Sequence, residues 1–176
     1  MTDLRYPIGK FSYEGEAGGP QRRDWIEAIA AAPAALRAAV AGLTPAQIDT
    51  PYRPDGWTVR QVVHHIPDSH LNAYTRFKLA LTEDEPTIKP YDEARWAELS
   101  DTRTVPLEVS LELLEALHER WVALLRALTA EEYRRAFHHP EHGRALTLDE
   151  GLGMYAWHGR QHVAHITSLR QREGWS

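Results

Sequence analysis

Histidines spaced one helical turn apart are the residues of this chain that could do chemistry. His158 and His162 are four positions apart, so on a helix they differ by about 40° around the axis and share one face. Ile166 and Leu169 lie on the same face, which indicates that it is directed to the core. Two inward imidazoles at this spacing can bind a first-row metal ion without distorting the helix. Zinc metalloproteases use the same spacing, but the glutamate that serves them as general base is absent here.

A third ligand for such a pair has to come from another helix. His64 and His65 are adjacent in an earlier predicted helix, and His70 follows them. Helical periodicity alone does not decide whether His64 or His65 points inward. One ligand from a facing helix would complete a three-histidine site in the core of a helical bundle. Three protein ligands leave open positions on the metal for water or substrate, which is typical of a catalytic site.

The other histidines are weaker candidates, because a single histidine on an apolar face is more often a hydrogen-bonded core residue than a metal ligand. His118 lies at the flank of a leucine-rich face and is either such a core residue or a fourth ligand candidate. His138, His139 and His142 fall in a segment that contains proline and glycine, and we expect them to be exposed to solvent.

The composition narrows the classes of function. The chain has 176 residues, with 20 Lys and Arg against 25 Asp and Glu, and this net charge of −5 argues against a nucleic-acid partner. It has no cysteine, which excludes disulfides, cysteine nucleophiles and thiolate metal sites. No apolar run approaches the roughly 20 residues that span a bilayer. The first residues do not follow the plan of a signal peptide, so we expect a cytoplasmic protein with no membrane association.

Hydrophobic periodicity and capping boxes predict four long helices, over residues 22–40, 59–81, 107–128 and 148–171. Pro33 lies inside the first of these helices and is expected to kink or restart it, and Pro67 lies inside the second and is expected to kink it. Residues 1–20 are rich in glycine and proline and are expected to form an extended arm. Residues 137–146 could form a hairpin or an irregular loop.

The lengths of the connections bear on the topology of the bundle. Roughly 25 and 19 residues separate the second helix from the third and the third from the fourth, and at about 3.3 Å per residue either stretch can cross a helix of about 30 Å. We therefore expect one all-α domain over residues 1–176, a four-helix bundle with long crossover connections, while a simple up-and-down bundle stays open.

Several segments of the chain also match a known pattern. They are the N-terminal Arg5–Gly9, the stretch Gly56–His65, and the segments 68–70, 76–83, 89–91, 157–158 and 162–166. In these segments the chain resembles the DinB/YfiT-like superfamily, and within it the YfiT group of metal-dependent hydrolases and bacillithiol transferases. The arm and the first connection are specific to that group, and the three-histidine pattern is shared with the wider superfamily.

The resemblance implies a four-helix bundle, a homodimer, and one divalent ion per subunit, with zinc or nickel favoured. Carried over residue by residue, it implies that His65, His158 and His162 bind the ion. His64 and His165 would then be neighbours of the ligands. Pro67 departs from the pattern, because relatives have a small residue other than proline there, and this puts the geometry after His65 in doubt.

Three neutral imidazoles permit two chemistries, because they leave the charge of the bound ion uncompensated. That charge can activate water for hydrolysis or enforce the thiolate of a cosubstrate, for which the resemblance suggests bacillithiol. Either would act on a small-molecule substrate. The pocket could be lined by a few polar residues to which we assign no catalytic role: Arg60, Arg76, Arg160, Tyr155 and Asp68.

A non-catalytic, stress-associated homodimer that only binds metal is the alternative to an enzyme. A fourth ligand from His64 or His165 would close the site and favour this alternative. An open position that faces a pocket would favour an enzyme.

Overall fold

The computed structural model describes residues 3–175. Its elements, in chain order, are α1 (Gly19–Val40), α2 (Pro45–Ile48), α3 (Val59–Thr82), α4 (Glu93–Trp96), α5 (Ser100–Thr104), α6 (Leu107–Ala127), a 3₁₀ turn (Glu132–Arg134), β1 (Ala136–His139), β2 (Arg144–Thr147) and α7 (Leu148–Glu173). The four long helices are those predicted, with ends shifted by up to three residues. No helix of the described chain is long and apolar enough to cross a membrane.

The helices begin and end where the local sequence supplies caps. At the start of α3, the Thr58 hydroxyl accepts the N–H of Gln61 (3.2 Å), and the Gln61 side chain accepts the N–H of Thr58 (3.0 Å). At the start of α7, Thr147 Oγ1 accepts the N–H of Glu150 (3.1 Å). Gly174 ends α7 at a φ of 67°, a left-handed conformation that glycine adopts without strain. Local chemistry thus fixes the helices that carry the candidate ligands.

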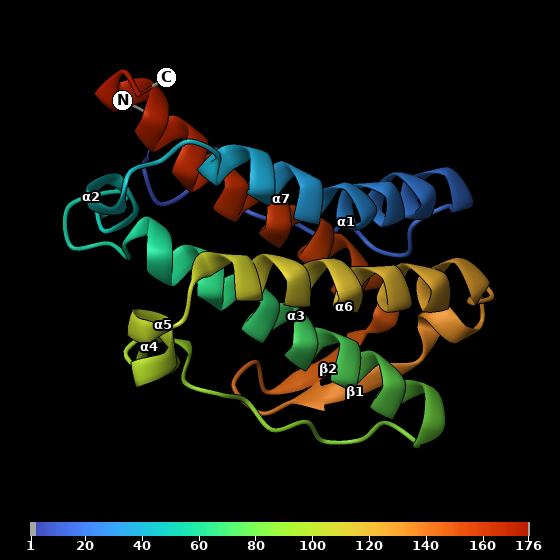
Figure 1. Ribbon diagram of the computed structural model, residues 1–176. Helices are drawn as coiled ribbons and strands as arrows, with labels where there is room; N and C mark the ends of the chain where they lie inside the picture. Colours follow the sequence, from blue (N-terminus) through green and yellow to red (C-terminus); the bar gives the residue numbers. More distant parts are fainter. Residues whose placement is uncertain (1–2, 176) are drawn as a thin grey trace.

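The four long helices pack in a ring, in which α1 and α3 each contact both α6 and α7 (Figure 1). Helices α1 and α7 run parallel. Arg22 near the start of α1 pairs with Asp149 near the start of α7 (2.6 Å), and Arg170 near the end of α7 donates to the carbonyl of Ala39 (2.9 Å). The result is a four-helix bundle in which neighbours along the chain are not always neighbours in space.

Helices α3 and α6 are also parallel, and this requires a crossover. His64 near the start of α3 contacts Ser110 near the start of α6 (2.7 Å), and Phe77 and Trp121 pack further along the pair. Because parallel neighbours begin at the same end, the chain that leaves α3 has to return along the bundle. Residues 83–106 make this return and carry the short helices α4 and α5. The predicted long crossover is confirmed here.

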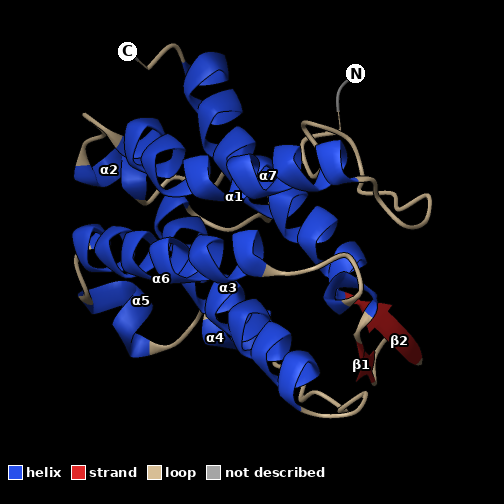
Figure 2. Cartoon of the chain, turned by 90° about the vertical axis from the view of Figure 1, so that its right-hand side faces the viewer, coloured by secondary structure: helices blue, strands red, loops and turns tan. Residues whose placement is uncertain are grey.

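The connection from α6 to α7 contains a hairpin, one of the two alternatives considered for residues 137–146. Strands β1 and β2 pair antiparallel, in a register that places Ala136 opposite Thr147. The crossover lies along the free edge of β1, because His138 donates its N–H to the carbonyl of Pro86 (2.9 Å) and accepts the N–H of Ile88 (3.1 Å). Figure 2 shows the hairpin beyond the start of α7, at one end of the bundle.

The apolar core consists of two clusters. One is centred on Phe77, Trp121 and Leu152, and the other on Val62, Leu114 and Ile166. Along α3, α6 and α7, respectively, His70, His118 and His158 fall between the residues of one cluster and those of the other. A layer of imidazoles therefore crosses the bundle between two hydrocarbon regions.

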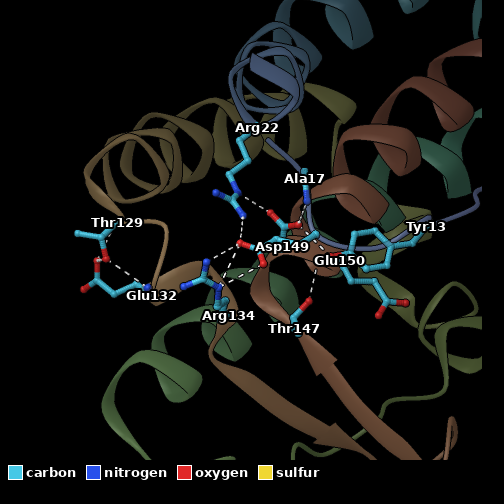
Figure 3. Close-up of polar contacts among 10 residues, drawn as sticks. Tyr13, Ala17, Arg22, Thr129, Glu132, Arg134, Thr147, Asp149 and Glu150 are labelled. Carbon is cyan, nitrogen blue, oxygen red and sulfur yellow. Dashed lines mark hydrogen bonds and ion pairs between the residues drawn. The ribbon is translucent and has the colours of Figure 1, made fainter. Parts of the chain in front are cut away.

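The N-terminal arm is tied to the start of α7 by a buried carboxylate (Figure 3). Asp149 is 1% exposed and accepts hydrogen bonds from the Tyr13 hydroxyl (2.9 Å) and the Ala17 N–H (2.6 Å), besides its ion pair with Arg22. The arm ends earlier than predicted, because Gly19 already belongs to α1.

Farther out, the arm follows α7 toward the histidines. Trp157 donates its indole N–H to the carbonyl of Gly9 (2.9 Å), and Gln161 donates to the carbonyl of Arg5 (2.7 Å). The arm therefore runs beside the face of α7 that carries the predicted metal ligands.

Both helix-interior prolines lie within continuous helices. Helix α1 runs from Gly19 to Val40 through Pro33, so the predicted restart does not occur, and α3 runs through Pro67. Each proline lacks an N–H, so the carbonyl four residues earlier loses its helical donor. In α1 that carbonyl belongs to Ile29.

Candidate metal centre

Three imidazoles from two helices converge on one point. His65 lies on α3, and His158 and His162 lie one turn apart on α7. One ring nitrogen from each of the three lies within 4.8 Å of the other two, and the Nε2 atoms of His65 and His158 are 3.3 Å apart. The structure thus brings together the three residues that the resemblance selected, although periodicity alone could not choose between His64 and His65.

The spacing of the nitrogens fits a metal ion. Two nitrogens that each lie about 2.0–2.1 Å from a tetrahedral zinc ion are about 3.3–3.4 Å apart, which matches the separation of the His65 and His158 Nε2 atoms. All three donors are imidazole nitrogens, which suit zinc, copper, nickel or iron(II). The donor set and the spacing therefore fit a divalent cation.

Burial keeps these imidazoles unprotonated. Removal from water lowers the pKa of His65 to about 4 and the pKa values of His158 and His162 well below their usual range, and the neighbouring imidazoles lower them further in the two α7 residues. A neutral imidazole has a lone pair free for a metal ion, whereas a protonated one has none. Near neutral pH the ring nitrogens are therefore ready to bind a cation.

The two neighbours that could have closed the site do not face it. His64 Nδ1 contacts the hydroxyl of Ser110 on α6 (2.7 Å). His165 lies behind His162, with its Nδ1 at 3.3 Å from the His162 Nδ1. Among residues 3–175, the group of potential ligands at this point consists of His65, His158 and His162.

A cavity of about 480 Å³ opens beside the three histidines. That volume is in the range of pockets that bind small molecules. Part of its wall is aromatic, with Trp57 packing against His65 at a ring-centroid distance of 4.7 Å. Arg5 and Tyr6 of the arm also line it, so a segment remote in sequence forms part of the wall.

Of the five pocket residues considered from the sequence, Arg76 lies on the cavity wall. It is half-buried and forms no ion pair with any residue of the described chain. Arg60 instead pairs with Asp49 (2.7 Å), and Arg160 donates to the carbonyl of Ala156 (3.0 Å). Arg76 is therefore a cation available to a ligand in the cavity.

His139 is a correction to the prediction of exposed loop histidines. It is 7% exposed and lines the cavity, and burial together with the charge of Arg76 lowers its pKa to about 4. Its strand lies against the crossover, which is far away in sequence. The one local signal is that Phe137 and His139 are two positions apart in a strand, so their side chains lie on the same face. His142, in contrast, is exposed.

Two buried histidines lie behind the site. His118, expected to be either a core residue or a ligand candidate, is a core residue at 2% exposure, and its Nε2 lies 2.8 Å from the Nδ1 of His70. His70, to which the sequence assigned no face, is 0% exposed, and its Nε2 lies 3.1 Å from the Nδ1 of His158. Sequence reasoning missed the contact between them, which follows only from the packing of α3 against α6.

A helical bundle that directs three imidazoles at one point beside a cavity belongs to the class of bundles that build metal sites in their core. Comparison with known proteins gives the particular family. The model of the DinB superfamily matches residues 28–166, and the chain belongs to this superfamily and to its YfiT group.

Several relatives match over nearly the whole chain. A Bacillus subtilis protein named "Putative metal-dependent hydrolase YfiT" is 51% identical over 175 residues, which cover 99% of this chain and 98% of the relative. A Bacillus cereus protein named "Putative metal-dependent hydrolase" is 55% identical over 99% of this chain and 100% of its own length.

The solved structure of YfiT from Bacillus subtilis superposes with a TM-score of 0.96 at 51% identity, over 98% of this chain and 99% of that one. It is described as "a probable metal-dependent hydrolase with an unusual four-helix bundle topology".

Proposed function

We propose that the protein is a metal-dependent hydrolase that acts on a small molecule and binds one divalent cation through His65, His158 and His162. The observation that carries the proposal is the convergence of ring nitrogens from three histidines beside a cavity of about 480 Å³. The names of the relatives support the same activity.

The residues around the site have separate parts in this activity. A divalent cation held by three neutral ligands supplies positive charge that lowers the pKa of a water or thiol ligand. His65 and the α7 pair hold that charge at the cavity wall. Arg76, which forms no ion pair within residues 3–175, binds and orients an anionic group of the substrate.

The open side of the histidine cluster favours an enzyme over a protein that only retains metal. His64 and His165 lie outside the group of ring nitrogens that converge at this point, so among residues 3–175 neither adds a fourth ligand to it. All three histidines line the cavity, so a cation that they held would be within reach of a substrate there.

Transfer of a small thiol, such as bacillithiol, to an electrophile is the second candidate. The absence of cysteine from the chain means that any sulfur nucleophile has to enter the cavity as a cosubstrate. A free thiol with a pKa of about 8.5 needs less help than water to ionise near neutral pH. The same open cation site therefore serves this reaction.

Metal content tests the ligand set. We expect one equivalent of zinc or nickel per chain, and its loss in His158→Ala and His162→Ala with the helical circular dichroism retained. His142→Ala, which removes an exposed histidine, is the matched control. Full occupancy in both α7 variants would overturn the assignment.

Two assays then separate hydrolysis from transfer. The metal-loaded protein is incubated with a panel of esters and amides, and separately with bacillithiol and monochlorobimane. Metal-dependent turnover of the panel supports hydrolysis, and metal-dependent formation of the bimane conjugate supports transfer. If neither rate exceeds that of the chelated protein, the site is not catalytic toward these substrates and the non-catalytic alternative is favoured.

We also retain the homodimer and the cytoplasmic location as proposals. The homodimer rests on the resemblance to the YfiT group, and sedimentation equilibrium of the purified protein tests it directly.

A further inference from the structure

We propose that His70, His118 and His165 form two hydrogen-bonded relays that fix the tautomers of the α7 ligands and direct the Nε2 lone pairs of His158 and His162 at the cation. The inference rests on the proposed metal site. It goes beyond that site by assigning a positioning role to three histidines and to Pro33.

The first relay begins at a carbonyl that Pro33 leaves without its helical donor. That carbonyl belongs to Ile29, and His118 Nδ1 lies 2.7 Å from its oxygen. A carbonyl oxygen can only accept, so the hydrogen has to be on His118 Nδ1. Because a helix-interior proline removes one backbone bond, the acceptor is provided by the sequence of α1 itself.

The direction of every later bond in this relay follows from the first. A neutral imidazole carries one N–H, so His118 Nε2 is an acceptor, and the His70 Nδ1 at 2.8 Å has to donate to it. His70 Nε2 is then an acceptor in turn, and the His158 Nδ1 at 3.1 Å donates to it. The remaining nitrogen of His158, Nε2, has no hydrogen and faces His65.

Burial supports the neutral state that this argument needs. His70 and His118 are at most 2% exposed, and no carboxylate contacts either ring among residues 3–175. An uncompensated charge would be costly in this environment. The relay is therefore a chain of neutral imidazoles.

The second relay begins on the N-terminal arm. His165 Nε2 lies 3.0 Å from the carbonyl oxygen of Arg5 and has to donate to it. His165 Nδ1 is consequently an acceptor, and the His162 Nδ1 at 3.3 Å donates to it. Gln161 Nε2 donates to the same Arg5 oxygen (2.7 Å), which explains its contact with His165 Nε2 at 3.3 Å. Both α7 ligands are thus held by a relay that ends on a main-chain carbonyl, His158 through His70 and His118, and His162 through His165.

Such partners matter to metal sites in general. A second hydrogen bond to a metal-binding histidine fixes its tautomer and ring orientation, and removing it typically reduces metal affinity about 10- to 100-fold. The relays therefore prepare His158 and His162 before any cation arrives.

The tautomers can be measured without metal. In two-bond ¹H–¹⁵N correlation spectra of the chelated wild-type protein, we expect hydrogen on Nδ1 of His70, His118, His158 and His162, and on Nε2 of His165. Hydrogen on Nε2 of His158 or His162 would overturn the corresponding relay.

Paired variants of His118 test the contribution of the first relay to affinity. A glutamine amide offers an acceptor and a donor on one carbon, as the imidazole does, whereas leucine offers neither. We expect Zn²⁺ affinity, measured by competition with a chelator, to fall about 10- to 100-fold in His118→Leu and to stay within a few-fold of wild type in His118→Gln. Equal affinities in wild type and His118→Leu would overturn the positioning role.

The tautomer spectra test the relays, and the Zn²⁺ affinities test the metal site of the proposed function, so the failure of one can be distinguished from the failure of the other. If the wild-type protein binds no Zn²⁺, the proposed function fails, and the tautomers of the chelated protein still decide whether the relays exist. The spectra of the wild-type chain also decide the matter if His118→Leu does not fold.

Discussion

Burying a histidine as a neutral group makes the folded protein sensitive to acid, and His118 illustrates the effect. Burial lowers its pKa to about 4, against the hydrogen bond to Ile29, which raises it. An unfolded chain would protonate the same residue near 6.5. Between these two values the unfolded state binds more protons than the folded state, so stability falls as the pH falls.

We predict that this loss can be isolated with His118→Gln, which keeps a donor and an acceptor but does not titrate. In chelated protein, the free energy of unfolding should decline between pH 6 and pH 5 more steeply in wild type than in the variant, by about 1.2 kcal/mol over this pH unit. Urea denaturation across this range measures both slopes. Identical slopes would contradict the assignment, and His142→Gln is the exposed control.

Other groups shift the overall profile without removing this difference. Burial also lowers the pKa of His65 to about 4, so this residue adds to the loss of stability in acid. Asp68 acts in the opposite direction. Burial and the charge of Asp101 raise its pKa in the folded protein to about 6, so as the pH falls the folded protein binds this proton before the unfolded chain does. The comparison of variants is therefore more informative than the wild-type curve alone.

At the scale of elements, α7 organises the molecule. It carries two candidate ligands, borders both apolar clusters and receives the N-terminal arm along its length. Helix α1, which runs parallel to α7, packs closely against glycines of α7. Substitutions at the contacts of α7 should therefore affect the arm, the bundle and the site together.

The buried ion pair between Asp149 and Arg22 leads to a prediction about the arm. We expect Asp149→Ala to lower the free energy of unfolding by about 3–5 kcal/mol, because it leaves the Arg22 charge buried and removes the acceptor of Tyr13 and Ala17. Chemical denaturation measures the loss, and limited proteolysis should show cleavage within the arm.

The control for this variant is Glu27→Ala. Glu27 pairs with Arg126 at 2.7 Å, but both side chains are more than half exposed, so the change should cost less than about 1 kcal/mol. Equal losses of unfolding free energy in Asp149→Ala and Glu27→Ala would contradict the prediction that the buried ion pair contributes more than the exposed one.

The contact between α1 and α7 depends on a glycine. A Cβ on Gly153 would lie 3.0 Å from two ring carbons of Trp25. We predict that Gly153→Ala destabilises the protein by about 1 kcal/mol, because overpacking of about 1–3 kcal/mol exceeds the gain of about 1 kcal/mol in helix propensity. Thermal denaturation measures the change. Adding Trp25→Phe removes the clashing ring and should recover most of the loss, and no recovery would point to another cause.

At the scale of the whole molecule, the imidazole layer links all four long helices. The ligands lie on α3 and α7, and the first relay reaches α6 and the Ile29 carbonyl of α1. A cation bound to this layer would therefore stabilise the entire bundle.

We predict that Zn²⁺ at 100 times its dissociation constant raises the free energy of unfolding by about 2.7 kcal/mol, because it binds the folded state only. Denaturation with Zn²⁺ and with a chelator measures the difference. His158→Ala should show no response to Zn²⁺. A response equal to that of wild type would place the ion elsewhere.

The bundle was predictable from the sequence because its signals are local. Capping residues such as Thr58 and Thr147, and the periodic apolar residues behind them, set the helices. The spacing of His158 and His162 likewise placed them on one face. His65 could not be chosen over His64 from periodicity, because adjacent residues differ by about 100° and neither followed the apolar stripe.

The rest of the site arises from contacts between distant segments. The burial of His139 depends on the crossover beside β1, and the contact of His70 with His118 depends on two helices that run parallel. The sequence pattern of a single helix cannot predict such contacts between elements. The arm is a further case, since the carbonyl of Arg5 meets His165 only in the folded chain.

The proline in α1 has an evolutionary consequence. The acceptor at position 29 is a main-chain oxygen, which every residue has. A comparison of side chains at this position among relatives would therefore not reveal it. The trace lies at position 33, where proline is tolerated inside a helix at a typical cost of about 3 kcal/mol. We expect Pro33 and His118 to be inherited as a pair, and a lineage that has lost the imidazole should be free to replace the proline.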